Sequence, residues 1–192
     1  MNIHTLIESS HILGKDRGFW KSDKDLREEM LYIFSNVGDI AKAFKKGRRA
    51  DWDSHERDSI GSSIKKEIYE LYIKDSFEDE IANVILRITD LIGGKKIDIV
   101  AAHPWIKPYE DVHLNYFFVN VKPKKEFYEN VPHWLNEALA ACMFSADKDQ
   151  DYGFSHILFH LGSLIEFYDI DIERHLIKKM EYNRLRPILY KS

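Results

Sequence analysis

Two pairs of oxygen-bearing side chains stand three residues apart in the sequence. Asn36 and Asp39 form the pair in "NVGD", and Glu80 and Asn83 form the pair in "EIAN". Residues three apart lie on the same face of an α-helix, and an apolar stripe runs beside each pair. If the two stripes pack together, four side-chain oxygens converge at the edge of the buried seam. Such oxygens are the ligands that Mg²⁺ prefers, so the spacing indicates a candidate magnesium site, although polar pairs are also common on solvated helix faces.

The elements that must position these residues are helices, because apolar residues recur at helical spacing along most of the chain. Glycines at 14, 47, 93 and 94 are interpreted as helix ends. The segment "RRADWDSHERDSIGSS" is predicted to be a polar connection that can include a short helical turn, and "VHLNYFFVNV" is either a strand or a buried loop. Helices are predicted at about 2–13, 24–46 after a cap at Ser22 or Asp23, 65–72, 77–92, 133–145, 154–168 and 171–185. The predicted fold class is all-α.

Composition limits the remaining possibilities. The 192 residues are 44% hydrophobic, enough for one core, so residues 1–192 are predicted to form a single domain. The net charge is −4, which gives no broad basic field and argues against nucleic-acid binding. Cys142 is the only cysteine, no apolar run reaches membrane-spanning length, and "MNIHTLIESS" lacks the features of a signal peptide. We therefore expect a cytoplasmic protein with no nucleic-acid or membrane partner.

Basic and hydrogen-bonding side chains share one face of the last predicted helix. Lys179, Asn183 and Arg186 recur at i, i+4 and i+7, with Tyr182 beside them. Basic residues also favour the carboxyl end of a helix through its dipole, and this ordinary explanation stays open. The basic run "KKGRR" at 45–49 is ambiguous in the same way.

Three segments in this order resemble the MazG-like branch of the all-α nucleoside triphosphate pyrophosphohydrolases. They are "GFWKSDKDLREEMLYIFSNVGDIAKAFKKGRRADW", "DSFEDEIANVILRITDLIGGKKIDI" and "DIERHLIKKMEYNRLRP". The most specific parts are "FEDEIANVILRITDL" and "KMEYNRLRP". The resemblance implies a MazG-like helical bundle that assembles as a homodimer. It also implies a nucleoside triphosphate as ligand and Mg²⁺ as cofactor, with Mn²⁺ as an alternative.

The resemblance also assigns roles to residues at matched positions. The metal ligands would be Asn36, Asp39, Glu80 and Asn83, of which Asp39 and Glu80 are the catalytic carboxylates; Lys179, Tyr182, Asn183 and Arg186 would bind phosphate; and Phe19 and Trp20 would lie near the base. The family has carboxylates at all four metal positions, whereas two are amides here. One lost carboxylate forfeits up to about 4 kcal/mol of attraction per unit of cation charge. Weaker magnesium binding is therefore expected, unless Glu29, Glu78 or Asp79 compensates. Asp79 is expected to be an ordinary surface acid.

The middle of the chain departs from the family pattern. Residues 83–99 align without gaps with residues 156–172, and both segments end in "IDI". In the family the first of these helices leads almost directly into the basic helix, so residues at about 100–155 are interpreted as an insertion. The resemblance thus implies a magnesium-dependent hydrolase that releases a nucleoside monophosphate and pyrophosphate. A nucleotide-binding protein without turnover and a structural helical protein are the alternatives.

Overall fold

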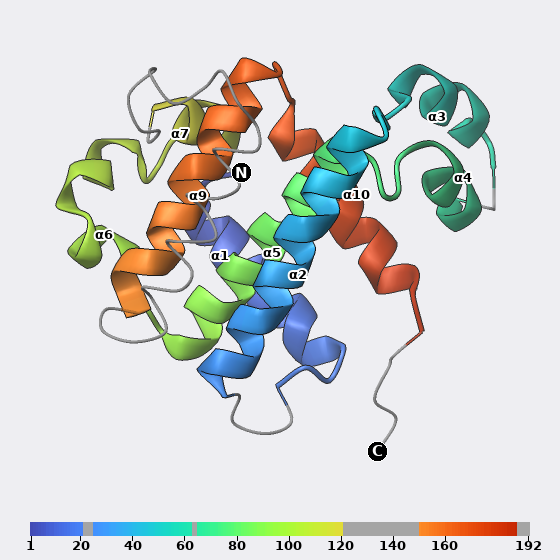
Figure 1. Ribbon diagram of the computed structural model, residues 1–192. Helices are drawn as coiled ribbons and strands as arrows, with labels where there is room; N and C mark the ends of the chain where they lie inside the picture. Colours follow the sequence, from blue (N-terminus) through green and yellow to red (C-terminus); the bar gives the residue numbers. More distant parts are fainter. Residues whose placement is uncertain (21–24, 63–64, 121–149, 188–192) are drawn as a thin grey trace.

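The computed structural model describes residues 1–20, 25–62, 65–120 and 150–187, and every regular element in these ranges is a helix (Figure 1). This confirms the predicted all-α class. Within these ranges, no helix is both long and apolar enough to cross a membrane. The helices are α1 (Ile3–Asp16), α2 (Leu26–Lys45), α3 (Trp52–Ser59), α4 (Lys65–Tyr72), α5 (Phe77–Lys95), α6 (Ile99–Ala102), the 3-10 helix η1 (Pro104–Tyr109), α7 (Leu114–Asn120), α9 (Gln150–Phe167) and α10 (Ile172–Leu185).

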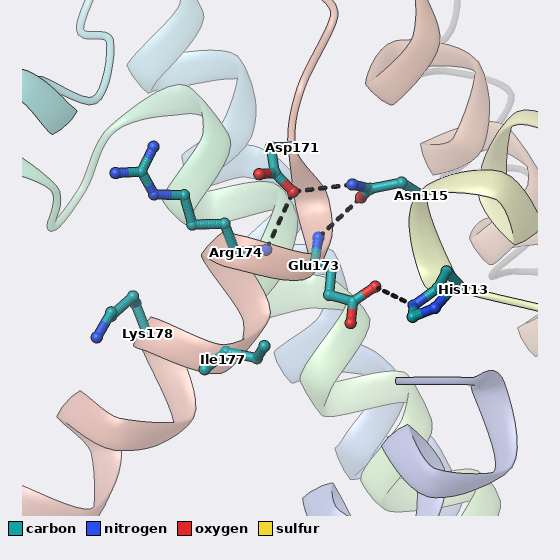
Figure 2. A pocket seen from close by; sticks show the side chains of 7 residues that line it. All are labelled: His113, Asn115, Asp171, Glu173, Arg174, Ile177 and Lys178. Carbon is teal, nitrogen blue, oxygen red and sulfur yellow. Dashed lines mark hydrogen bonds and ion pairs between the residues drawn. The ribbon is translucent and has the colours of Figure 1, made fainter.

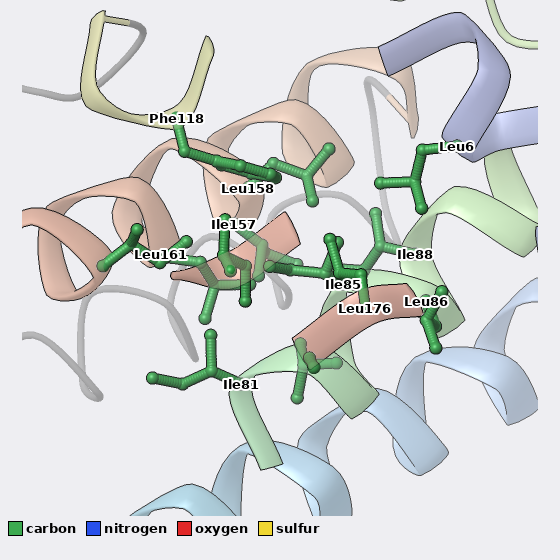
Figure 3. Packing of buried hydrophobic residues seen from close by; sticks show 14 of the residues in the cluster. Leu6, Ile81, Ile85, Leu86, Ile88, Phe118, Ile157, Leu158, Leu161 and Leu176 are labelled. Atoms are coloured by element: carbon green, nitrogen blue, oxygen red, sulfur yellow. The ribbon is translucent and has the colours of Figure 1, made fainter. Parts of the chain in front are cut away.

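Helix α5 is the centre of the bundle, in contact with α1, α2, α9 and α10 (Figure 1). Its sequence carries apolar residues on several sides, so one stripe packs against α2 while others meet the remaining neighbours. Figure 3 shows Ile85 and Ile88 of α5 with Leu176 of α10, and the α9 side chains Leu158 and Leu161 belong to the same cluster. Ile33, Val37 and Ile40 of α2 are fully buried in the same core as the apolar stripe of α5, which confirms that the two helices pack together, whereas Phe44 at the end of the α2 stripe is 40% exposed.

Polar side chains at the helix starts explain where several elements begin. The Ser76 side chain accepts a hydrogen bond from the Asp79 backbone N–H, which starts α5 at Phe77. Asp51 caps α3 and Asp171 caps α10 in the same way. Each such cap typically contributes about 1 kcal/mol to stability. The predicted starts of α5 and α10 are therefore confirmed.

Three glycines that were expected to end helices lie inside them instead. Gly14 is within α1, and Gly93 and Gly94 are within α5, which continues to Lys95. A Cβ at Gly94 would lie 1.9 Å from the Trp20 ring, and one at Gly14 would lie 2.6 Å from the Asp90 carboxylate. These glycines therefore allow close packing of α1, α5 and the Trp20 ring. Chain reversal after α5 uses a left-handed residue, Lys96, at φ 56°.

One segment was predicted incorrectly, a second contains a longer helix than expected, and two further predictions lie on residues that the structure does not describe. Residues 114–120 form helix α7, where a strand or a loop was expected, because Leu114, Phe117 and Phe118 at helical spacing bury one face. The polar connection after residue 48 contains a full two-turn helix, α3, capped by Asp51. The helix predicted at 133–145 and the cap predicted at residue 22 or 23 lie outside the described residues.

The junctions that follow α5 and α9 have the same geometry. Lys96 and Asp169 are both left-handed, at φ 56° and 51°. The Ile97 N–H donates to the Ile92 carbonyl at 3.0 Å, and the Ile170 N–H donates to the Ile165 carbonyl at 2.8 Å. Asp98 and Asp171 then each cap the next helix. The alignment of the two "IDI" segments thus corresponds to a repeated local structure, while the interpretation of residues 100–155 as an insertion stays a prediction.

Helices α3 and α4 project from one end of the bundle and dock against α10 (Figure 1). Trp52 of α3 donates its indole N–H to Nε2 of His175 on α10, at 3.0 Å, and the two rings meet edge to face. His175 is buried, and burial lowers its pKa from 6.5 to about 4. The negative charges of Glu78 and Asp79 act in the opposite direction but are outweighed by burial. The docking contact therefore requires a neutral imidazole.

Acidification should weaken the fold through His175. Because its pKa is lower in the folded than in the unfolded chain, its contribution to stability is complete above pH 6.5 and is lost as the pH falls towards 4. Between pH 7 and pH 5 the free energy of unfolding should fall by about 2 kcal/mol more in the wild type than in His175→Gln, which keeps an acceptor but does not titrate. Urea unfolding at several pH values measures this, and equal pH dependence in both proteins would contradict it.

Candidate active site

Three carboxylates gather where α5 begins. Asp75, Asp79 and Glu80 each place one oxygen within 4.8 Å of the others. Asp75 has a left-handed backbone at φ 61°, a conformation that aspartate adopts more readily than most residues other than glycine. The Asp75 backbone N–H donates to the Asp79 carboxylate at 3.0 Å, so the turn is tied to the helix that follows. Asp75 was not identified from the sequence, although it stands two residues before the acidic segment "FEDE" at 77–80.

Asp79 is completely buried, which corrects the expectation of a surface acid. Its exposed fraction is 0%. Its Oδ2 accepts a hydrogen bond from the Lys179 ammonium at 2.7 Å, and its Oδ1 accepts one from the Tyr69 hydroxyl. Burial and the Asp79 charge raise the pKa of Tyr69 well above its usual value, so the phenol stays a donor. Asp79 therefore joins α4, α5 and α10 through a buried charged network.

Glu80 has a different environment from Asp79. Only 7% of the residue is exposed, yet within the described part of the chain its carboxylate forms no hydrogen bond or ion pair. Burial raises the pKa of Glu80 to about 7, with further increases from the charges of Asp79, Asp39 and Asp75 that Lys179 opposes. A buried carboxylate without a partner is costly when ionised, and a cation bound beside it would remove that cost.

Of the two α2 residues of the predicted site, Asp39 is the one whose charge acts at this end of α5. Asp39 is close enough to affect the charge of Glu80, and its carboxylate is 3.8 Å from the Lys42 ammonium. Asn36 and Asn83 are half-buried. The structure thus brings Asp39 and Glu80 into one electrostatic neighbourhood, and the convergence of all four side chains on one point stays a prediction.

The other acids that were considered as substitutes are engaged elsewhere. Glu78 is buried, and its carboxylate accepts hydrogen bonds from the Arg49 guanidinium and, at 3.0 Å, from the Ala50 backbone N–H. Glu29 forms an ion pair with Arg87 at 2.7 Å. Within the described cluster, Asp75 is therefore the additional carboxylate beside Glu80, together with the Lys179-bound Asp79.

The predicted phosphate-binding residues of α10 have structural partners. Lys179 is buried against Asp79, and the Tyr182 hydroxyl donates to Glu70 at 2.7 Å while its ring stacks on Tyr69. Burial and this hydrogen bond raise the pKa of Tyr182 to about 12. Asn183 is half-buried, and Arg186 is exposed with its guanidinium over the Tyr182 ring. Their phosphate-binding role stays a prediction, with Arg186 the most accessible of the four.

The aromatic pair predicted near the base lies at the other half of α5. Trp20 donates its indole N–H to the Asp90 carboxylate at 2.7 Å, and the same oxygen is 3.1 Å from Nδ1 of His11. The Arg87 guanidinium lies over the Phe19 ring at 5.7 Å. These contacts give Phe19 and Trp20 a packing role in the bundle, and their proximity to a base stays a prediction.

A separate open cavity of about 480 Å³ lies between α7 and the start of α10 (Figure 2). Its polar groups satisfy one another: Asn115 bonds Asp171 and the Glu173 backbone, and His113 faces the Glu173 carboxylate at 3.5 Å. It holds no cluster comparable to the one at α5. The start of α5 is therefore the stronger candidate, because it combines convergent oxygens with a buried carboxylate lacking a partner.

This arrangement fits a divalent cation bound through oxygen. Asp75 and Glu80 offer carboxylate oxygens, Asp39 adds charge nearby, and the amides of Asn36 and Asn83 are neutral oxygen donors in the same pair of helices. Comparison of the chain with protein-family models, curated proteins and solved structures finds no match.

Proposed function

We propose that this protein is a magnesium-dependent nucleoside triphosphate pyrophosphohydrolase, which releases a nucleoside monophosphate and pyrophosphate. The observation that carries the proposal is Glu80. It is a buried carboxylate, without a hydrogen-bond or ion-pair partner in the described residues, and it lies beside Asp75 and Asp79. The resemblance of the sequence to MazG-like enzymes, from which the proposal starts, implies a metal-binding carboxylate at this same position.

Asp75 and Glu80 would hold the Mg²⁺ ion, with Asp39 contributing charge from α2. The oxygen-only donor set suits this cation, which keeps several water molecules and is commonly bound by one or two carboxylates together with substrate phosphates. Bound there, Mg²⁺ would supply a polarised water for attack on the nucleotide and would neutralise charge on the phosphates.

Hydrogen bonds within the protein fix part of this carboxylate cluster without a bound ligand. Lys179 and Tyr69 hold Asp79 in place, and Asp79 in turn holds the Asp75 backbone at 3.0 Å. The network therefore fixes the turn that presents the Asp75 carboxylate beside Glu80. Such preorganisation lowers the cost of assembling ligands around a cation, because the carboxylates do not have to be ordered on binding.

Nucleotide binding without turnover is the second candidate function. Two observations favour it: Asn36 and Asn83 replace expected charges, and Asp79 is already neutralised by the buried Lys179 ammonium. Fewer net negative charges at the cluster mean weaker attraction for a divalent cation. Binding could then persist while the chemical step is lost.

A screen of the common ribo- and deoxyribonucleoside triphosphates separates the two. Pyrophosphate release that needs Mg²⁺ or Mn²⁺ supports the hydrolase. A rise in melting temperature with nucleotide but without pyrophosphate release supports the binding protein, because ligands that bind only the folded state stabilise it. Neither response with any nucleotide would refute both.

A further inference from the structure

Of the two cations expected to bind phosphate on α10, Lys179 is committed to the protein itself, and Arg186 is exposed over the Tyr182 ring. Lys179 is buried with its ammonium 2.7 Å from Asp79, and Tyr182 is bonded to Glu70. A nucleoside triphosphate is a polyanion, and the carboxylates at the start of α5 repel it unless further positive charge lies nearby. A phosphate ligand at this site therefore needs basic side chains other than Lys179.

The loop that follows α2 offers such side chains. Lys45, Lys46 and Arg48 are exposed, and none of them forms an ion pair or side-chain hydrogen bond within the described ranges. The neighbouring Arg49 differs, because it binds Glu78 and lies over the Tyr168 ring at 5.5 Å. The run "KKGRR" thus contains one structural arginine and three cations available to a ligand.

The backbone of this loop is fastened to the first turn of α5. Gly47, at φ 64°, reverses the chain after α2, and the Arg48 N–H closes the turn on the Ala43 carbonyl at 3.1 Å. The Arg48 carbonyl then accepts a hydrogen bond from the Phe77 N–H at 2.9 Å. Two residues further on, Ala50 is tied to Glu78. The backbone of Arg48 is therefore held next to Phe77, the first residue of α5, and Phe77 lies between Asp75 and Asp79 in the sequence.

We propose that Arg48 and Lys46 bind the polyphosphate chain of the nucleotide whose cation is held at Asp75 and Glu80. This inference rests on the proposed function and adds the part of the site that recognises phosphate. Attraction of lysine to the end of a helix can account for Lys45 in the last turn of α2, but it does not account for Arg48, which lies beyond the helix. The planar guanidinium suits paired phosphate oxygens, and the lysine adds a mobile point charge.

Inorganic tripolyphosphate is the appropriate probe, because it tests the phosphate contacts without a base or sugar. Its binding in the presence of Mg²⁺ is measured by calorimetry for the wild type, for Lys46→Gln/Arg48→Gln, and for Lys15→Gln/Lys107→Gln. The last variant removes the same charge from exposed lysines on α1 and η1. We expect the loop variant to bind about 10-fold or more weakly, and the control to stay within about 2-fold of the wild type. Magnesium binding without tripolyphosphate should be similar in all three proteins.

The outcomes separate the two proposals. Equal tripolyphosphate affinity in the loop variant and the wild type would overturn the role of Arg48 and Lys46 while leaving the proposed function intact. An equal loss in the loop variant and the control would overturn it too, because the effect would then reflect net charge alone. If the wild type binds neither tripolyphosphate nor any nucleoside triphosphate, the proposed function falls and this inference falls with it.

Discussion

Replacing Lys179 with methionine is expected to lower the free energy of unfolding by about 3–5 kcal/mol. The reason is burial: the Asp79 carboxylate has no exposed surface, and the Lys179 ammonium is the ionic partner that compensates its charge. Methionine preserves much of the side-chain volume but leaves that charge unpaired. Urea unfolding at neutral pH measures the loss, and near-UV circular dichroism shows whether the folded variant keeps its packing.

Lys178 provides the matched control on the same helix. Its ammonium lies 2.8 Å from Glu181, but both side chains are exposed, so Lys178→Met should cost no more than about 1 kcal/mol. A second comparison removes both buried charges: Lys179→Met/Asp79→Asn should recover part of the stability that Lys179→Met loses, because no unpaired ion remains. Equal losses for Lys179→Met and Lys178→Met would show that the buried pair does not organise the start of α5.

Glu80→Gln is expected to reduce pyrophosphate release by about 100-fold or more, because it removes a proposed metal ligand. The same substitution should not lower the stability of the fold. Without metal, the substitution removes a buried negative charge that has no described partner and that faces Asp75 and Asp79. The variant should therefore melt at the same temperature as the wild type or higher. Pyrophosphate assays and melting curves in a metal chelator give the two readouts.

Glu29→Gln is the matched comparison for stability. Glu29 is as buried as Glu80, but its carboxylate is paired with Arg87, so the same chemical change should lower the melting temperature. For activity, Glu8 on the exposed face of α1 is the reference, and Glu8→Gln should leave turnover unchanged. Unaltered turnover in Glu80→Gln would place the chemistry elsewhere.

The helices could be predicted from the sequence wherever local signals decide them. The start of α5 follows from Ser76 before an acidic first turn, and the start of α10 follows from Asp171. The ends of α1 and α5 could not be predicted in this way, because Gly14 and Gly94 are required by tertiary contacts with Asp90 and Trp20 and do not act as local stops. A glycine that permits close packing and a glycine that ends a helix look the same in one sequence.

The candidate site, too, could be predicted only where local spacing reveals it. The three-residue spacing of Asn36 with Asp39 and of Glu80 with Asn83 singled out one face of α2 and one of α5, and the structure brings the charge of Asp39 close enough to affect Glu80. Burial of Asp79 depends on Lys179, one hundred residues later in the chain, so no local pattern reveals it. Asp75 was missed because it precedes the helix, where helical periodicity gives no information about the direction of a side chain.

Magnesium binding measured by calorimetry on the wild type, Glu80→Gln and Asp75→Asn tests the account most directly, because it addresses the cation site without requiring turnover. The account predicts that the wild type binds Mg²⁺ in the presence of tripolyphosphate and that each variant binds it about 10-fold or more weakly, while the folded structure is retained. Equal magnesium affinity in all three proteins, or no magnesium binding by the wild type with tripolyphosphate, would contradict the assignment of the start of α5 as a cation site.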